Sequence, residues 1–391
     1  MQDVFIVSVA RSPIGALSGS LAALSGVELG AQAIRAAVKR AGIEPAQVQE
    51  VIMGNVLQAN MGQAPARQAA LAAGISPHAA CTTINKVCAS GMKAIALGAQ
   101  SIMLGDHDVV VAGGMESMTN APYMIPSGRS GYRYGNGELL DAIVRDGLQD
   151  PYKKYMMGEA GEICADKYQF SREAQDAYAV ESYKRAQAAY AAGFFAEELF
   201  EVEIAGRGGS TLVKEDEEPG KIKWDKVSSL KPAFRKEGTI TAINASKIND
   251  GSAAVVLMSG RKVAELGIKP LARIVSYGDA EQEPEWFTTA PAKALPVALK
   301  KAGLSVDQID AFEINEAFSV VALANIQEMG LPHEKTNQFG GAVALGHPVG
   351  VSGARIIITL ISVLKNKGGK RGAAAICNGG GGASSMVIEL C

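Results

Sequence analysis

The chain has 391 residues, of which 48% are hydrophobic but only 6% aromatic, and its formal net charge is -2. This length exceeds one ordinary core, so we expect two or three domains built mainly from aliphatic side chains. The balance of acidic and basic residues argues against nucleic acid or an anionic membrane as the main partner. No apolar run is judged long enough to cross a bilayer, so no membrane-spanning segment is expected.

The cysteines are odd in number and lack the paired spacing of metal ligands, which indicates reduced thiols in an intracellular protein. They are Cys81, Cys88, Cys164, Cys377 and Cys391. A buried strand is predicted from residue 4, so no transit peptide is expected in this chain. The expected compartment is the cytoplasm, with the mitochondrial matrix as the alternative.

The first part of the chain alternates apolar strands with amphipathic helices, which is typical of an α/β architecture with a largely buried sheet. Gly42 and Gly105 follow two of the helices and are expected to end them. We expect strands at 4–10, 51–56, 82–87 and 109–114, and helices at 26–41, at 65–73 and from Cys88 to about 104.

The segment 117–249 has a different composition. It contains Pro- and Gly-rich turns at 122–137 and a polar helix at 171–192, and it includes a charged run at 214–218 that we expect to be a solvated loop. The segment is therefore predicted to be an inserted loop domain. A strand at 252–258 and a helix at 260–266 return the chain to the layered core.

The second half of the chain repeats the first. Residues 37–43 (AVKRAGI) match residues 298–304 (ALKKAGL), and 90–93 (SGMK) match 352–355 (SGAR). One α/β unit is therefore predicted to be duplicated about a pseudo-twofold axis, so that equivalent loops face each other. The expected domains are 1–116 with 250–267, the loop domain 117–249, and 268–391.

Cys88 is the first candidate for chemistry, because it lies among small residues at the start of a predicted helix. Unpaired N–H groups and the helix dipole there favour a thiolate, the form that attacks a carbonyl. A buried structural cysteine is the alternative. In the second half, Asn315 ends an apolar strand, His347 lies in a glycine-rich turn, and Cys377 precedes four glycines. Each of these would be structural if it stood alone.

Four motifs nevertheless occur together and in order: VCASG at 87–91, NEAF at 315–318, GHP at 346–348 and CNGGGG at 377–382. With them the whole chain resembles the thiolase family, most closely its acetoacetyl-CoA thiolases. The resemblance implies a duplicated thiolase fold with a layered α/β/α/β/α core and an inserted loop domain. It also implies an acyltransferase that condenses two acetyl-CoA into acetoacetyl-CoA and CoA through an acetyl-cysteine.

The resemblance assigns a role to each motif. Cys88 would be the nucleophile, and His347 its base and a donor to the thioester oxygen. Asn315 would hold a water in that oxyanion site. Cys377 would move the proton of the second acetyl-CoA, and the N–H groups of Cys88 and Gly379 would stabilise the acyl-enzyme oxyanion.

The resemblance further implies CoA contacts at Ser246, Leu148, Met157, Ala317 and Phe318, with Lys221, Lys223 and Lys226 near the nucleotide. No cofactor would be required, although some members bind potassium at positions matching Tyr183, Ala242, Ile243, Ala245 and Val343. A homo-oligomer, either a dimer or a tetramer, is also implied, and the loop 122–137 is expected to be either a tetramer contact or a mobile surface loop.

The sequence leaves other functions to consider. The glycine run after Cys377 could suggest a dinucleotide-binding loop, but no G-x-G-x-x-G follows the first strand. A broader-range 3-ketoacyl-CoA thiolase stays open, because Met156 stands where the acetoacetyl-specific members have His. A ketoacyl synthase shares the fold but has His where this chain has Cys377. A non-catalytic acyl-CoA or lipid carrier is disfavoured because Cys88, Asn315, His347 and Cys377 are all present.

Overall fold

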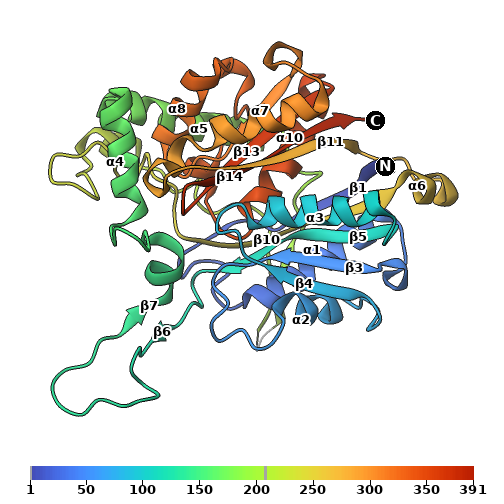
Figure 1. Ribbon diagram of the computed structural model, residues 1–391, viewed down its shortest axis with the longest axis horizontal. Coiled ribbons are helices and arrows are strands. Elements are labelled where there is room, and N and C mark those ends of the chain that lie inside the picture. Colours follow the sequence, from blue (N-terminus) through green and yellow to red (C-terminus); the bar gives the residue numbers. More distant parts are fainter. Residues whose placement is uncertain (1, 207–208) are drawn as a thin grey trace.

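The computed structural model describes residues 2–206 and 209–391. Its centre is a ten-stranded mixed sheet in two halves (Figure 1). The first half contains β1 (Val4–Arg11), β2 (Gly15–Ala16), β3 (Glu50–Gly54), β4 (Ala80–Ile84), β5 (Val109–Ser117) and β10 (Asn249–Ser259). The second contains β11 (Ala272–Glu281), β12 (Ala311–Ile314), β13 (Arg371–Asn378) and β14 (Gly382–Leu390). Within the described part of the sheet, a short antiparallel pairing between β1 and β11 connects the two half-sheets.

Four strands of each half have the same order and pairing, while β4 and β2 of the first half have no counterpart among the strands described in the second. In the first half β3 runs parallel to β5, and β10 lies antiparallel between β5 and β1. In the second half β12 runs parallel to β13, and β14 lies antiparallel between β13 and β11. The duplication predicted from the repeated sequence is therefore confirmed.

Helices complete five layers, as Figure 1 shows. One outer face is covered by α1 (Gly26–Ala41) and α2 (Pro65–Ala72), and the other by α7 (Pro291–Ala302), beside which α8 (Ser319–Met329) packs. Between the half-sheets α3 (Ser90–Leu104) packs against α10 (Ser352–Lys367). Two short helices, α6 (Gly260–Leu266) and α9 (Ala342–Leu345), lie in connections.

The two middle helices touch at glycines that are equivalent in the repeat. A Cβ at Gly91 would lie 2.8 Å from the backbone nitrogen of Ala354, and one at Gly353 would lie 2.5 Å from that of Met92. Both positions therefore need a residue without a side chain for the helices to approach this closely.

One stretch, residues 87–104, has the length and hydropathy of a membrane span, contrary to the expectation from the sequence. This stretch contains α3, and more than half of it is buried inside the protein. Its position between the two half-sheets explains its apolar composition without a membrane.

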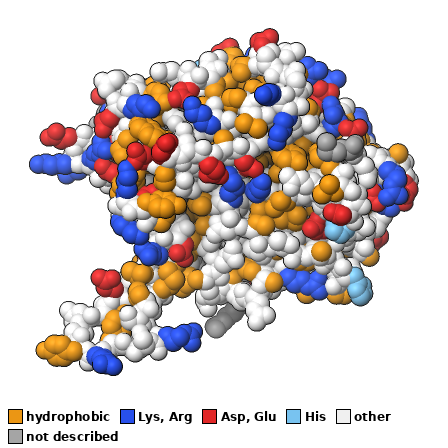
Figure 2. Space-filling view, viewed as in Figure 1, with side chains coloured by type: hydrophobic (Ala, Val, Ile, Leu, Met, Phe, Trp, Pro, Cys, Tyr) orange, Lys and Arg blue, Asp and Glu red, His pale blue; other side chains and the backbone are white. Residues whose placement is uncertain are grey.

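The insertion between β5 and β10 holds α4 (Met157–Tyr168), α5 (Arg172–Ala191) and two hairpins, β6 (Tyr123–Met124) with β7 (Leu140–Asp141) and β8 (Val202–Gly206) with β9 (Gly209–Val213). The chain between β6 and β7 forms an arm that stands away from the body and carries apolar side chains at its tip (Figures 1 and 2).

The charged run at 214–218 is not the solvated loop that was expected. Asp216 is buried and accepts two hydrogen bonds from the Arg11 guanidinium, at 2.8 and 3.0 Å. Arg11 is itself buried at the end of β1 and also bonds Glu198 at 2.6 Å. A buried arginine requires such partners, so this ion cluster fixes the insertion to the sheet.

Candidate active site

Cys88 lies in a sharp turn between β4 and α3. The preceding residue, Val87, has a φ of 47°, which is a rare conformation for a β-branched side chain. The Ser90 hydroxyl stabilises the turn by donating to the Val87 carbonyl at 2.6 Å and accepting from the Lys86 N–H at 2.8 Å. Strain of this kind is typical of functional positions, and here it orients the cysteine.

The Cys88 turn meets the loop that follows β13 in the other half. The backbone N–H of Gly379 points at the Cys88 thiol and lowers its pKa. Lys86 joins the same two loops, because its ammonium donates to Asn378 Oδ1 at 3.0 Å and to the Ala383 carbonyl at 3.3 Å. The pseudo-twofold arrangement therefore brings the first cysteine to the loop of the second.

The prediction that Cys88 is a thiolate before substrate binds is wrong. Burial raises the pKa of the thiol to about 12, and the N–H groups of Gly379 and of Cys88 itself lower it by less. Helix α3 begins at Ser90, so Cys88 lies just before its first turn, as expected, but this position does not offset the effect of burial. Cys88 is consequently a neutral thiol at neutral pH and needs a base.

His347 has the protonation state of such a base. Its Nδ1 lies 2.6 Å from Ser352 Oγ, and the Ser352 hydroxyl donates to the Pro348 carbonyl at 3.1 Å. Ser352 therefore accepts from Nδ1–H, which leaves the lone pair on Nε2. Burial, and after it the positive charge of Arg355, lowers the pKa of His347 to about 3, so the ring is neutral.

Asn315 and Cys377 end neighbouring strands, β12 and β13. The Asn315 side chain is buried, and its amide nitrogen and oxygen form no hydrogen bond within the described part of the chain. Such a group is available to a substrate or a water. Burial raises the pKa of the Cys377 thiol well above its usual value, and the charge of Cys88 raises it further. Gly379, whose N–H points at the Cys88 thiol, follows Cys377 by two residues, so both thiols belong to one site.

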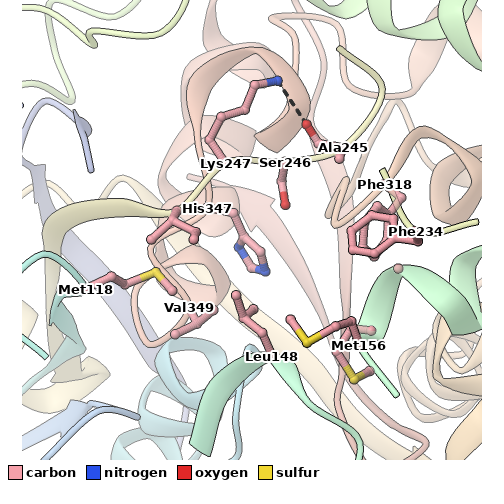
Figure 3. A pocket seen from close by; sticks show the side chains of 13 residues that line it. Met118, Leu148, Met156, Phe234, Ala245, Ser246, Lys247, Phe318, His347 and Val349 are labelled. Carbon is pink, nitrogen blue, oxygen red and sulfur yellow. Dashed lines mark hydrogen bonds between the residues drawn. The ribbon is translucent and has the colours of Figure 1, made fainter. Parts of the chain in front are cut away.

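A cavity of about 260 Å³ opens beside these groups. The His347 ring points into it, among side chains from the insertion and from the second half (Figure 3). Its lining includes four of the predicted CoA contacts, Leu148, Met157, Ser246 and Phe318. The fifth, Ala317, lies behind Ser246 and accepts from its N–H at 3.0 Å.

The predicted nucleotide contacts lie apart from this cavity. Lys221, Lys223 and Lys226 line a second cavity of about 210 Å³, and Lys247 lines both. The structure therefore brings the three lysines together, but in a neighbouring depression and not in the cavity that contains His347.

The residues expected to hold potassium do not fit that ion, because a side-chain ammonium is bound there. The Lys247 ammonium donates to the carbonyls of Ala245 at 2.9 Å and Val343 at 3.1 Å. It also lies 5.3 Å from the centre of the Tyr183 ring. Ala242 and Ile243 line the adjoining cavity of the lysines.

Sequence reasoning missed Ser352, Lys86 and Lys247 as functional residues. The repeat contained a signal for Ser352, because this serine matches Ser90 and each begins a middle helix beside a catalytic residue. Lys86 and Lys247 gave no such signal. Both partners of Lys86, and the Val343 partner of Lys247, lie far away in the sequence.

Comparisons with known proteins agree with this geometry. Residues 4–261 match the thiolase N-terminal domain and residues 268–390 the thiolase C-terminal domain. A probable acetyl-CoA acetyltransferase of Dictyostelium discoideum is 56% identical over 100% of this chain and 94% of its own. Acetyl-CoA acetyltransferase 2 of Arabidopsis thaliana is also 56% identical, over 100% and 97%.

Solved structures give the same result. The acetyl-CoA acetyltransferase of Bacillus anthracis has a TM-score of 0.98 at 42% identity, over 100% of this chain and 99% of its own. Acat5 thiolase from Ascaris suum, in complex with coenzyme A, has a TM-score of 0.95 at 46% identity, over 100% of both chains. The doubled fold, the meeting of the two cysteine loops and these full-length matches show that the chain belongs to the thiolase family.

Proposed function

We propose that this protein catalyses the reversible condensation of two acetyl-CoA into acetoacetyl-CoA and CoA. The observation that supports it best is the meeting of two thiols from opposite halves, Cys88 and Cys377, with the Gly379 N–H aimed at the first. The names of the Dictyostelium and Arabidopsis relatives and the coenzyme A bound to the Ascaris thiolase support the substrate.

The first step is acyl transfer. His347 Nε2 takes the Cys88 proton as the sulfur attacks the thioester carbon, and the C–S bond of acetyl-CoA breaks. The departing CoA thiolate takes the proton of Cys377 and leaves as CoA. The enzyme then holds acetyl-Cys88, an imidazolium at His347 and a thiolate at Cys377.

The second step is carbon–carbon bond formation. The Cys377 thiolate removes a methyl proton from the second acetyl-CoA, whose thioester oxygen is stabilised by His347 and by a water on Asn315. The resulting carbanion attacks the acetyl carbon, while the N–H groups of Cys88 and Gly379 stabilise the oxyanion. Cys88 leaves and recovers its proton from His347, which restores the starting state.

In this proposal CoA lies along the insertion. Its pantetheine arm passes Ser246, Leu148, Met157 and Phe318 in the apolar cavity, with Ala317 behind them. The phosphates reach Lys221, Lys223 and Lys226 in the adjoining depression, where cationic side chains favour them.

Trapping of the acyl group tests the function. Wild-type protein mixed with acetyl-CoA labelled in the acetyl group should carry label on the Cys88 peptide and release acetoacetyl-CoA. Cys377→Ala should keep the label and lose the product, and Cys88→Ala should lose both. No label on wild-type protein, or equal label on Cys88→Ala, would contradict the proposal.

Thiolysis of longer 3-ketoacyl-CoA is the second candidate. The wall of the catalytic cavity contains Met118, Met156 and Met157, and methionine side chains adapt to ligands of different length. A series of 3-ketoacyl-CoA of increasing chain length separates the candidates, since an acetoacetyl-specific enzyme loses kcat/KM as the chain is extended.

We also propose that the arm between β6 and β7 is a contact between copies of the chain in a dimer or tetramer. It exposes several large apolar side chains, Tyr123, Ile125, Tyr132, Tyr134 and Leu139. Such a patch is typical of an association surface. Light scattering on wild-type protein and on Tyr134→Ser with Leu139→Ser tests it, because the double variant should form a smaller species.

A further inference from the structure

Lys247 is a partly buried cation whose direct contacts are neutral groups. Two of its three N–H donors bond the carbonyls of Ala245 and Val343, and the Tyr183 ring lies beside the charge. It forms no salt bridge with any residue that the structure describes. The carboxylates of Glu218 and Glu316 act on its charge from a distance and raise its pKa.

These two carbonyls belong to segments that form different walls of the catalytic cavity. Ala245 precedes Ser246 and forms a bridge with Phe318, both of which line the cavity. Val343 lies in α9, which ends at Gly346, directly before His347. The ammonium therefore joins the substrate-binding segment to the short helix that leads to the catalytic histidine. Figure 3 shows the first of these two hydrogen bonds, from Lys247 to the Ala245 carbonyl.

The backbone here needs a positive partner. Carbonyl oxygens that converge in a buried place are costly unless a donor or a cation satisfies them. Burial lowers the pKa of Lys247 to about 8, against the opposing influence of Glu218 and Glu316, so the ammonium form still predominates at neutral pH. The aromatic face of Tyr183 adds a cation–π interaction.

We propose that Lys247 is a positioning residue which supplies, from the chain itself, the monovalent cation that holds α9 and His347 against the CoA-binding segment. It follows that a dissolved potassium ion is not needed for activity. This inference rests on the proposed thiolase activity for its kinetic test, but its binding test does not.

The kinetic test compares wild type, Lys247→Ala and Lys247→Met in tetramethylammonium, sodium, potassium and ammonium chlorides at one ionic strength. Wild-type thiolysis of acetoacetyl-CoA should agree in all four salts. Lys247→Ala should lose on the order of tenfold or more in kcat in tetramethylammonium chloride and recover at least part of it in potassium or ammonium chloride. Lys247→Met fills the space without charge and should stay slow in every salt.

Thermal unfolding provides a readout that does not require activity. Potassium or ammonium should raise the Tm of Lys247→Ala, by binding where the side chain was, and should not raise that of wild type or of Lys247→Met. The proposal is overturned if potassium activates wild type several-fold, if Lys247→Ala keeps full activity, or if no small cation changes its rate or its Tm. An inactive wild type with the expected Tm shifts would instead count against the thiolase assignment alone.

Discussion

The Nδ1 atom of His347 lies 2.6 Å from the hydroxyl oxygen of Ser352, the first residue of α10. Because that hydroxyl donates to the Pro348 carbonyl, it accepts from the imidazole and fixes which ring nitrogen carries the proton. The equivalent helix α3 begins with Ser90, whose hydroxyl supports the Cys88 turn. Each middle helix thus begins with a serine that orients a residue of the site.

Replacing Ser352 tests the role of this contact. In Ser352→Ala the His347 ring is free to rotate and to carry its proton on Nε2, so it is a base for Cys88 only part of the time. We expect kcat/KM for thiolysis to fall by on the order of tenfold or more, within the range that a general base contributes. Ser352→Thr keeps the hydroxyl and should retain most of the activity. Equal rates for wild type and Ser352→Ala would show that the tautomer is fixed by other contacts.

The pKa values of Cys88 and His347 predict how alkylation depends on pH. With a thiol pKa of about 12, the thiolate fraction of Cys88 rises about tenfold for each pH unit below that value. In His347→Ala, where the base is absent, iodoacetamide should label Cys88 at a rate that rises in this way from about pH 7 to about pH 10.

Mass spectrometry of the Cys88 peptide measures this rate separately from the other cysteines. Wild type should react faster than His347→Ala near neutral pH, because His347 has a pKa of about 3 and stays an unprotonated acceptor there. A plateau in the variant with an apparent pKa below about 9, the usual range of a thiol, would mean that Cys88 is a stabilised thiolate after all.

The sequence predicted the layered core well because the signals for its elements are local. Ser25 and Glu28 form a capping box at the start of α1, and Gly42 ends it in a left-handed conformation, so both ends of this helix are set within a few residues. The repeat then required the second half to fold as the first does.

Long-range contacts are where sequence reasoning failed. Asp216 lies in a run of charges that is polar by composition, yet it is buried by Arg11, 205 positions earlier in the chain. The pKa of Cys88 depends on burial between two halves of the molecule and not on its own helix. Lys247 likewise takes the place expected for potassium by donating to the carbonyl of Val343, which lies 96 residues away in the sequence.

Cys377 is expected to control proton transfer at carbon, and this can be measured without turnover. Wild type in deuterated water should exchange the methyl protons of acetyl-CoA, followed by NMR, whereas Cys377→Ala should show a loss of at least about 100-fold in exchange. Acylation of Cys88 should persist in the variant.

Cys164 provides the matched control for Cys377. It is a buried thiol in the same apolar cluster, and burial raises its pKa to about 11, but the proposed mechanism does not use it. Cys164→Ala should exchange the methyl protons at close to the wild-type rate. Retained exchange in Cys377→Ala would mean that a group other than Cys377 removes the methyl proton of acetyl-CoA.

The contact between the middle helices predicts a coupled pair of substitutions. A methyl group at Gly91 or at Gly353 would enter the backbone of the facing helix, so each alanine should lower the free energy of unfolding by about 1–3 kcal/mol. Gly220→Ala is the control, because a Cβ there meets no atom within 4 Å. Activity should fall as well, because Cys88 and Ser352 lie at the N-terminal ends of these two helices. Urea unfolding measures the loss of stability, and thiolysis rates measure the loss of activity.

The double variant, Gly91→Ala with Gly353→Ala, separates direct contact from two independent defects. Once one methyl group has pushed α3 and α10 apart, the second finds part of the space already open, so the double variant should lose less stability than the sum of the single losses. Additive losses would mean that the two glycines do not share one interface.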